Sequence, residues 1–109
     1  MKEQPYFQQV YDVVLQIPHG RVTTYGSIAD FLALGSARMV GAALKMSFYC
    51  DIPLPAHRVV NGAGLLSGAK AFGHPDMMKN LLESEGVTIK NNKVVNFKKL
   101  LWKPSEELL

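Results

Sequence analysis

The first half of the chain alternates apolar and polar positions with the period of a helix. Between residues 4 and 17 the apolar positions lie three or four apart, and they predict an amphipathic helix: Phe7, Val10, Val13, Val14 and Ile17. Pro18 and Gly20 then predict its end, because proline cannot continue a helix and glycine tolerates a turn. Residues 21–24 follow as a short extended link.

Two further helices are predicted before the middle of the chain. Thr24 is a suitable N-cap for a helix that continues to about Ala33. Gly35 is expected to break the chain, and Ser36 to cap a third helix that ends near Ser47. The inward positions of both helices are apolar: Ile28, Ala29, Leu32, Val40, Ala43 and Leu44. Two short helices joined by a glycine turn are typical of a helix-turn-helix, although any helical hairpin has similar spacing.

The outward face of the third helix combines basic and small residues. Arg38, Ala42 and Lys45 lie on it, with Gly41 beside them. Such a face can approach a polyanionic backbone closely and can enter even a minor groove about 6 Å wide. Alternatively, Gly41 and Ala42 only allow close helix packing. The spacing favours neither interpretation.

The middle of the chain contains a stiff stretch from Pro53 to Val60, which we call the elbow. Its two prolines stiffen the backbone, since each fixes its own φ and pushes the preceding residue to an extended shape. Val59 and Val60 are β-branched and predict a short strand. The Asn-Gly pair at residues 61–62 predicts a turn, after which the chain returns through two leucines.

A fourth helix and a hairpin are predicted in the last third. Pro75 is expected at the first helical position, and Gly86 just past the last one. The core stripe of this helix is apolar: Met77, Met78, Leu81 and Leu82. Residues 87–89 and 94–97 alternate around Asn91-Asn92 and predict a hairpin, which either resembles a wing or covers the core. The tryptophan near the C-terminus is expected to pack against the body.

Length and composition predict one domain over residues 1–109, mainly α with small β elements. The single cysteine, Cys50, excludes a disulfide within the chain, and no Cys/His cluster has zinc spacing. The first five residues contain no apolar run, and no window is long enough to cross a bilayer. We therefore expect no metal, no cofactor and no membrane partner, and a cytoplasmic or nucleoid-associated protein.

The net charge of +3 is less informative than its distribution. Residues 86–103 carry five lysines and no acid, while residues 71–85 and the C-terminal tail hold most of the acids. A basic surface beside a helix-turn-helix indicates nucleic acid. On charge alone, a solvated basic face is the better interpretation.

Residues 55–60, Pro-Ala-His-Arg-Val-Val, resemble the Pro-Cys-His-Arg-Val-Val signature of the O6-alkylguanine-DNA alkyltransferases, with Ala56 in place of the acceptor cysteine. Other motifs of that family have similar stretches here in the same order: residues 20–26, 37–41, 66–68 and 81–86. The absent cysteine and the ending Leu-Trp-Lys-Pro resemble the alkyltransferase-like subgroup, which keeps the DNA-binding domain. The resemblance implies a winged helix-turn-helix-like domain of the alkyltransferase C-terminal type.

The resemblance also implies roles for particular residues. Arg38 is the finger that fills the gap left by a flipped guanine, and Tyr25 helps to rotate the nucleotide. The DNA-binding residues would be Tyr25, Arg38, Gly41, Ala42 and Lys45. The lesion pocket would be formed by Tyr25, Pro55, Ala56, His57, Val59, Ser67 and Ala69. His57 and Glu85 match the proton relay of the enzymes, but without a thiol they are expected to brace the elbow.

The sequence departs from the family at several positions. Ala56 and Ala69 are both smaller than the residues common there, which predicts a wider pocket that holds a methyl group weakly and accepts larger adducts. The stretch between Tyr25 and Arg38 is one residue shorter than usual, which leaves the geometry of the turn open. Cys50 lies six residues before Ala56, in the link rather than on the elbow, so we expect an ordinary, partly buried thiol.

The function implied is that of a non-enzymatic sensor of DNA damage. It would bind double-stranded DNA in the minor groove, flip O6-alkylguanine into the pocket and flag it for nucleotide excision repair proteins, acting as a monomer. One alternative is a true methyltransferase domain whose acceptor cysteine has been changed to Ala56, or one that uses Cys50. The other is a plain winged-helix regulator that reads undamaged sequence.

Overall fold

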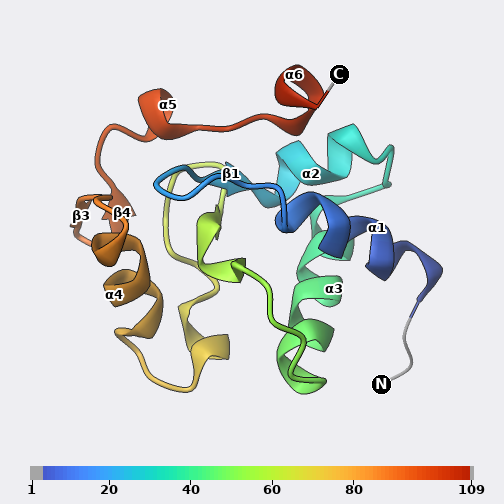
Figure 1. Ribbon diagram of the computed structural model, residues 1–109, viewed down its shortest axis with the longest axis horizontal. Coiled ribbons are helices and arrows are strands. Elements are labelled where there is room, and N and C mark those ends of the chain that lie inside the picture. Colours follow the sequence, from blue (N-terminus) through green and yellow to red (C-terminus); the bar gives the residue numbers. More distant parts are fainter. Residues whose placement is uncertain (1–3, 109) are drawn as a thin grey trace.

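The structure is a computed structural model that describes residues 4–108 and is mainly helical, with two short pairs of strands (Figure 1). The helices are α1 (Pro5–Val14), α2 (Tyr25–Phe31), α3 (Ala37–Tyr49), α4 (Met77–Ser84), α5 (Phe97–Leu100) and α6 (Pro104–Glu107), with 3₁₀ turns η1 (Ala56–Arg58) and η2 (Ala69–Phe72). The strands are β1 (Thr23–Thr24), β2 (Val59–Val60), β3 (Ile89–Lys90) and β4 (Lys93–Val94).

The predicted first helix is present and buries its apolar stripe. All five inward positions named from the sequence are buried, although α1 ends at Val14 and Ile17 lies in the turn that follows. These side chains pack with residues of α2 and α3 and with Trp102 in one core cluster. Trp102 is therefore part of this core, as expected. Its backbone N–H also donates to the Val22 carbonyl at 2.7 Å.

Helices α2 and α3 form the predicted helix-turn-helix, but the turn differs from the prediction. Thr24 caps α2 as expected, since its hydroxyl accepts from the Ser27 N–H at 3.0 Å. The helix ends at Phe31 because Ala33, not Gly35, adopts the left-handed conformation, with φ of 56°. Ser36 precedes α3 but makes no capping hydrogen bond. Helix α3 continues past the predicted end near Ser47 to Tyr49.

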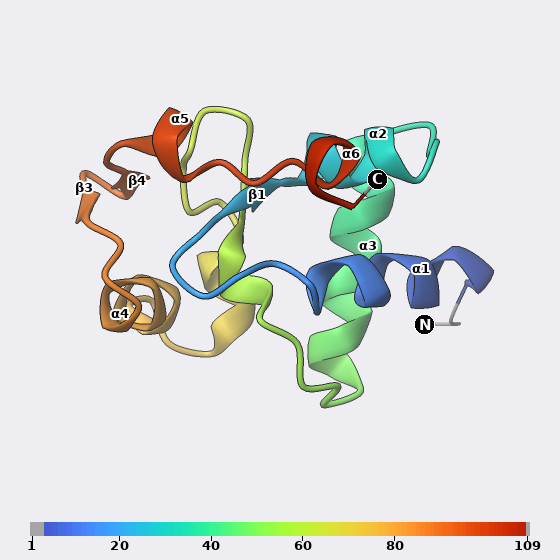
Figure 2. The same ribbon diagram turned by 45° about the horizontal axis from the view of Figure 1, so that its top comes forward.

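The second half of the chain builds a smaller core cluster beside the first. It joins α4, the β3–β4 hairpin and β2 through these buried residues: Val22, Val60, Leu66, Met78, Leu82, Val87 and Val94. Phe72 contacts both clusters and meets Phe48 of α3 edge-to-face, with 4.7 Å between ring centroids. In Figures 1 and 2, α4 and the hairpin lie at one end of the molecule and α1 to α3 at the other.

Two predictions about the last third need correction. Helix α4 begins at Met77, so Pro75 lies before the helix and not at its first position. Met78 and Leu82 are buried, whereas Met77 is 41% exposed and is not part of the core stripe. The hairpin around Asn91 and Asn92 is confirmed, and both residues have positive φ, as a tight two-residue hairpin turn requires. Its second strand was predicted too long, since β4 ends at Val94 and Phe97 begins α5. It packs beside α4 and buries Val94, so it covers the second cluster.

The extended link before Tyr25 has a partner that the sequence did not reveal. Strand β1 pairs in parallel with β2, with Thr23 opposite Val59 and Thr24 opposite Val60. This pairing connects the start of α2 directly to the stretch that carries Ala56. Among residues 4–108, no helix is long and apolar enough to span a membrane.

Candidate functional site

The elbow predicted at Pro53 to Val60 is a 3₁₀ turn held against a strand. Ala56 begins η1 directly after Pro55, and only 6% of its surface is exposed. The strand that follows η1 pairs with β1, which fixes the elbow relative to α2. The side chain at the start of this turn is thus the methyl group of Ala56, which has no nucleophilic atom.

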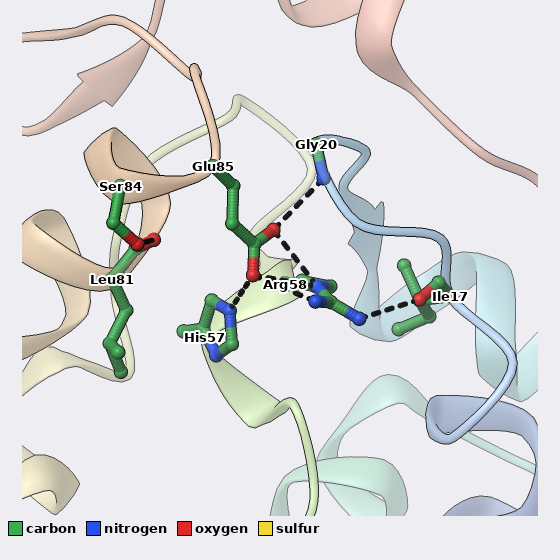
Figure 3. A network of polar contacts seen from close by, with 7 residues as sticks. All are labelled: Ile17, Gly20, His57, Arg58, Leu81, Ser84 and Glu85. Carbon is green, nitrogen blue, oxygen red and sulfur yellow. Dashed lines mark hydrogen bonds and ion pairs between the residues drawn. The ribbon is translucent and has the colours of Figure 1, made fainter.

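A buried carboxylate braces this elbow. Glu85, at the C-terminal end of α4, accepts from His57 Nε2 at 2.6 Å and from Arg58 Nη2 at 2.7 Å. It also accepts from the backbone N–H of Gly20 at 2.9 Å, and Arg58 Nη1 donates to the Ile17 carbonyl at 2.8 Å (Figure 3). We call these five residues the Glu85 brace. It connects the turn after α1, the elbow and the C-terminal end of α4 to one another.

The contacts of the brace determine the charge of Glu85. Burial raises its pKa, but the hydrogen bonds from Arg58, from the Gly20 N–H and from His57 outweigh burial and lower the pKa from 4.5 to about 2. An ionised carboxylate can only accept, so His57 Nε2 must be the donor in their hydrogen bond. If the ring is neutral, Nδ1 is then its basic nitrogen. That nitrogen has no thiol to deprotonate, because the adjacent residue is Ala56.

The predicted pair of His57 and Glu85 is therefore present, but Arg58 was missed as its third member. Arg58 makes two hydrogen bonds through Nε and one through Nη2 to the same carboxylate. The signal in the sequence was an arginine directly after the histidine in the middle of an apolar stretch. A half-buried guanidinium of this kind needs an acid or several carbonyls as partners.

Tyr25 lies against the loop that contains Ser67 and Gly68. Burial raises the pKa of the Tyr25 hydroxyl, and a hydrogen bond with Ser67 lowers it in part. A Cβ placed on Gly68 would lie 2.7 Å from this hydroxyl, so the absence of a side chain there makes room for Tyr25. Tyr25 and Ser67 are thus brought together as predicted, and Gly68 was not foreseen as a neighbour.

The other predicted pocket residues differ in how deeply they are buried. Ala69 is half-buried in η2, and Pro55 is half-buried before the elbow. His57 is buried and turned toward Glu85, whereas Val59 has no exposed surface and packs in the first core cluster. In this structure Val59 supports the elbow from behind and offers no surface to a ligand.

The outward face of α3 carries the remaining predicted residues. Arg38 and Lys45 are exposed, and Gly41 and Ala42 between them are partly exposed. A Cβ on Gly41 would meet no atom of the described chain within 4 Å, so packing within the chain does not require a glycine there. The interpretation of Gly41 as a residue needed for close helix packing is therefore not supported, and its role in DNA binding stays a prediction. Ala42 differs, since it packs against the first core cluster.

Cys50 is exposed at the C-terminal end of α3, not partly buried as expected, and its Sγ lies 3.4 Å from Met46 Sδ. A thiol becomes a nucleophile when a cation, a base or a helix N-terminus favours the thiolate. The contacts of Cys50 provide a thioether and a helix C-terminus. Its surroundings therefore agree with the prediction of an ordinary thiol.

The arrangement of helix-turn-helix, elbow and brace has a known counterpart. The family model "6-O-methylguanine DNA methyltransferase, DNA binding domain" matches residues 5–87. The chain belongs to this family. The match covers the helix-turn-helix, the elbow and α4, and it ends before the β3–β4 hairpin.

Relatives of three descriptions are similar to the chain. Alkyltransferase-like protein 1 of Schizosaccharomyces pombe is 36% identical, over 95% of this chain and 100% of its own length. A DNA base-flipping protein of Vibrio parahaemolyticus is 36% identical, over 88% of this chain and 94% of its own length. A methylated-DNA–protein-cysteine methyltransferase of Candida glabrata is 40% identical over 78% of this chain, which spans 40% of that relative.

Solved structures agree with the family fold. The structure of S. pombe Atl1 in complex with damaged DNA containing O6-carboxymethylguanine has a TM-score of 0.79 and 34% identity, over 95% of this chain and all of that one. The structure of Mycobacterium tuberculosis OGT in complex with DNA has a TM-score of 0.62 and 34% identity, over 77% of this chain and 51% of that one. The predicted fold class is thus confirmed, while the roles of individual residues stay predictions.

Proposed function

We propose that the protein is a non-enzymatic sensor that binds O6-alkylguanine in double-stranded DNA. The observation that carries this proposal is the elbow itself: the brace around it is complete, but Ala56 provides no acceptor atom. The similarity to an alkyltransferase-like protein, and to its structure in complex with damaged DNA, supports the same conclusion.

Alkyl transfer to the protein requires a nucleophile that attacks the alkyl carbon while the guanine oxygen leaves. The methyl group of Ala56 has no lone pair for this attack, and His57 has no thiol proton to accept. The carboxylate of Glu85 already accepts hydrogen bonds from three other residues of the brace. The elbow can therefore shape a binding surface, but it cannot take up the alkyl group.

Recognition of the lesion requires that the base leave the helix. Flipping costs a few kcal/mol of stacking and pairing, and a planar guanidinium can fill the vacated space and donate to the orphaned base. Arg38 is exposed at the N-terminal end of α3, next to the small residues that permit close approach. Tyr25 is fixed at the start of α2 by the Thr24 cap and the β1–β2 pairing, from where its phenol can press on the backbone.

The size of the pocket follows from Ala56 and Ala69. Both side chains end at Cβ, so neither provides an aromatic ring or a guanidinium to hold a small O6-methyl group. We therefore propose that larger O6 adducts bind at least as tightly as O6-methylguanine. Fluorescence anisotropy with duplexes that carry O6-methylguanine or O6-benzylguanine measures this, and a clear preference for the methyl adduct contradicts it.

The central test combines binding with a transfer assay. The protein should bind an O6-methylguanine duplex more tightly than the matched guanine duplex, and incubation with methyl-labelled DNA should leave no label on the protein. Stoichiometric label on the protein would contradict the sensor proposal. Label that disappears in a Cys50→Ser variant would identify the exposed thiol as the acceptor.

The alternative of a methyltransferase whose cysteine has been changed is tested by Ala56→Cys. This variant places a thiol beside His57 within the intact brace. Transfer by the variant, but not by the unchanged protein, would show that the elbow lacks only the acceptor atom. The alternative of a plain regulator is favoured if the protein binds undamaged DNA as tightly as the modified duplex.

The proposal extends to the setting in which the protein acts. Because a bound lesion is not repaired by the protein itself, another activity must remove it, and we propose nucleotide excision repair proteins as the partners. A monomer suits a reader of single lesions. A cytoplasmic or nucleoid-associated location follows from the proposed ligand. Copurification of repair proteins with the lesion complex, but not with free DNA, is the measurement that checks the partner.

A further inference from the structure

The C-terminal part of the chain gathers lysines that the site described above does not use. Four of them, which we call the lysine surface, come from the hairpin and from α5: Lys90, Lys93, Lys98 and Lys99. All four are exposed, and within residues 4–108 no carboxylate oxygen lies within 4 Å of their ammonium groups. These lysines lie outside the residues 5–87 that match the family model.

Some of these lysines repel one another in the folded chain. Lys90 and Lys93 lie directly opposite each other in the register of the β3–β4 hairpin. Like charges at such positions are destabilising by a few tenths of a kcal/mol. Lys98 and Lys99 add two further cations on a helix of only four residues. An external anion would relieve the repulsion between Lys90 and Lys93.

The lysine surface borders a preformed groove of about 490 Å³. Its lining combines cations with a partly apolar floor: Ala63, Lys93, Val94, Asn96, Phe97, Lys98 and Lys99. Its walls are connected by backbone hydrogen bonds, since the Val94 N–H donates to the Gly64 carbonyl at 3.0 Å. The Phe97 ring also lies against Gly64, where an added Cβ would come within 3.0 Å. A second groove shares Phe97 and Lys98 with the first and is lined by Glu106 and Glu107, whereas no acid lines the first groove.

The same segment is anchored close to Tyr25. Arg21 donates through Nε and Nη2 to the carbonyls of Leu100 and Leu101, at 2.9 and 2.8 Å. Val22 also pairs with Leu101, and Tyr25 follows three residues later. Chain geometry therefore places Lys98 at most about 25 Å from Tyr25. That distance is shorter than one turn of a DNA duplex, which is about 34 Å.

We propose that the lysine surface binds the phosphate backbone of the duplex beside the lesion. A duplex carries one negative charge per about 1.7 Å of its axis, and lysines bind phosphates as point charges without reading sequence. The surface would supply affinity for damaged and undamaged DNA alike, and would hold the duplex while Arg38 and Tyr25 test its bases. This inference rests on the proposed function for the identity of the ligand, but not on selectivity for lesions.

The test uses the full chain and two 21-base-pair duplexes that differ only in a central guanine or O6-methylguanine. A triple variant, Lys93→Gln, Lys98→Gln and Lys99→Gln, is compared with the unchanged protein across a series of salt concentrations. We expect its affinity for both duplexes to fall by the same factor, about tenfold or more at low salt. The slope of log K against log salt should decrease by about 2 to 3, since each lost phosphate contact removes about 0.9.

A matched control separates position from net charge. Lys98→Gln should weaken binding, while Lys79→Gln, an exposed lysine on α4, should change it less than twofold. The proposal is overturned if the triple variant binds DNA as tightly as the unchanged protein does. An acidic protein would then be the candidate ligand of the lysine surface. The proposal is also overturned if only the modified duplex is affected. Equal affinity of the unchanged protein for both duplexes would contradict the sensor proposal and leave this one standing.

Discussion

Replacing Glu85 with glutamine tests whether one buried carboxylate holds three parts of the chain together. The amide keeps the shape of the side chain, but it replaces one acceptor oxygen by an NH₂ group that faces the donors of His57 and Arg58. The change of the Glu85 pKa from 4.5 to about 2 on folding corresponds to about 3 kcal/mol. We therefore expect Glu85→Gln to lower the free energy of unfolding at pH 7 by about this amount.

The stability that Glu85 supplies depends on pH with a definite sign. Because folding lowers the pKa of Glu85, the unfolded chain binds the proton first as the pH falls. The contribution is complete above the unfolded pKa of 4.5 and is lost as the pH approaches the folded value of about 2. The unchanged protein should lose about 3 kcal/mol between about pH 5 and pH 2, and Glu85→Gln should lose correspondingly less.

Urea denaturation followed by circular dichroism between pH 7 and pH 2 measures both effects. Glu83→Gln is the matched control, because Glu83 is exposed on the same helix, and its free energy of unfolding should stay within about 0.5 kcal/mol of the unchanged protein. The reasoning is refuted if Glu85→Gln has the midpoint of the unchanged protein at pH 7. It is equally refuted if the variant keeps the full loss of stability in acid.

Three further substitutions test individual positions. Ala33→Gly should raise the free energy of unfolding by about 0.5–1 kcal/mol in thermal denaturation, because Ala33 has a φ of 56° and glycine adopts this conformation without strain. Gly68→Ala should displace the Tyr25 hydroxyl and weaken binding of an O6-methylguanine duplex several-fold, whereas Gly62→Ala, with open space around it, should not. Arg38→Ala should reduce affinity for the modified duplex at least tenfold with less than about 0.5 kcal/mol change in stability, since the side chain is exposed; unchanged binding in anisotropy would remove its role as a finger.

The elements set by local sequence were predicted well, and those set by distant contacts were not. The stripe from Phe7 to Ile17 and the Thr24 cap depend on neighbours within a few residues, and both are present as expected. The pairing of β1 with β2 joins residues far apart in the chain, and two-residue strands have no periodicity that could reveal it. The end of α2 was misplaced because glycine is the usual residue in the left-handed conformation, and here an alanine takes that position.

The candidate site shows the same division. The pair of His57 and Glu85 could be named only because motifs around each residue resemble those of a family, since nothing in the spacing of the two residues brings them together. Arg58 was overlooked although it lies within the strongest motif, because its partner comes from another motif. Gly68 was also missed, since the small size of a residue has meaning only once its neighbour, the Tyr25 hydroxyl, is known.

The brace explains why a proton relay can persist without its nucleophile. Glu85 binds the Gly20 backbone and Arg58 as well as His57, so its removal would leave Nε and Nη2 of Arg58 and the Gly20 N–H without their acceptor. The loss of these hydrogen bonds would lower the free energy of unfolding whether or not a thiol follows Pro55. Presence of the histidine–glutamate pair is therefore no sign of alkyl transfer in this fold. The proposed loss of alkyl transfer rests on one atom, the Sγ that Ala56 lacks, whereas the proposed binding surface of Arg38, Tyr25 and the loop around Gly68 does not use the carboxylate of Glu85.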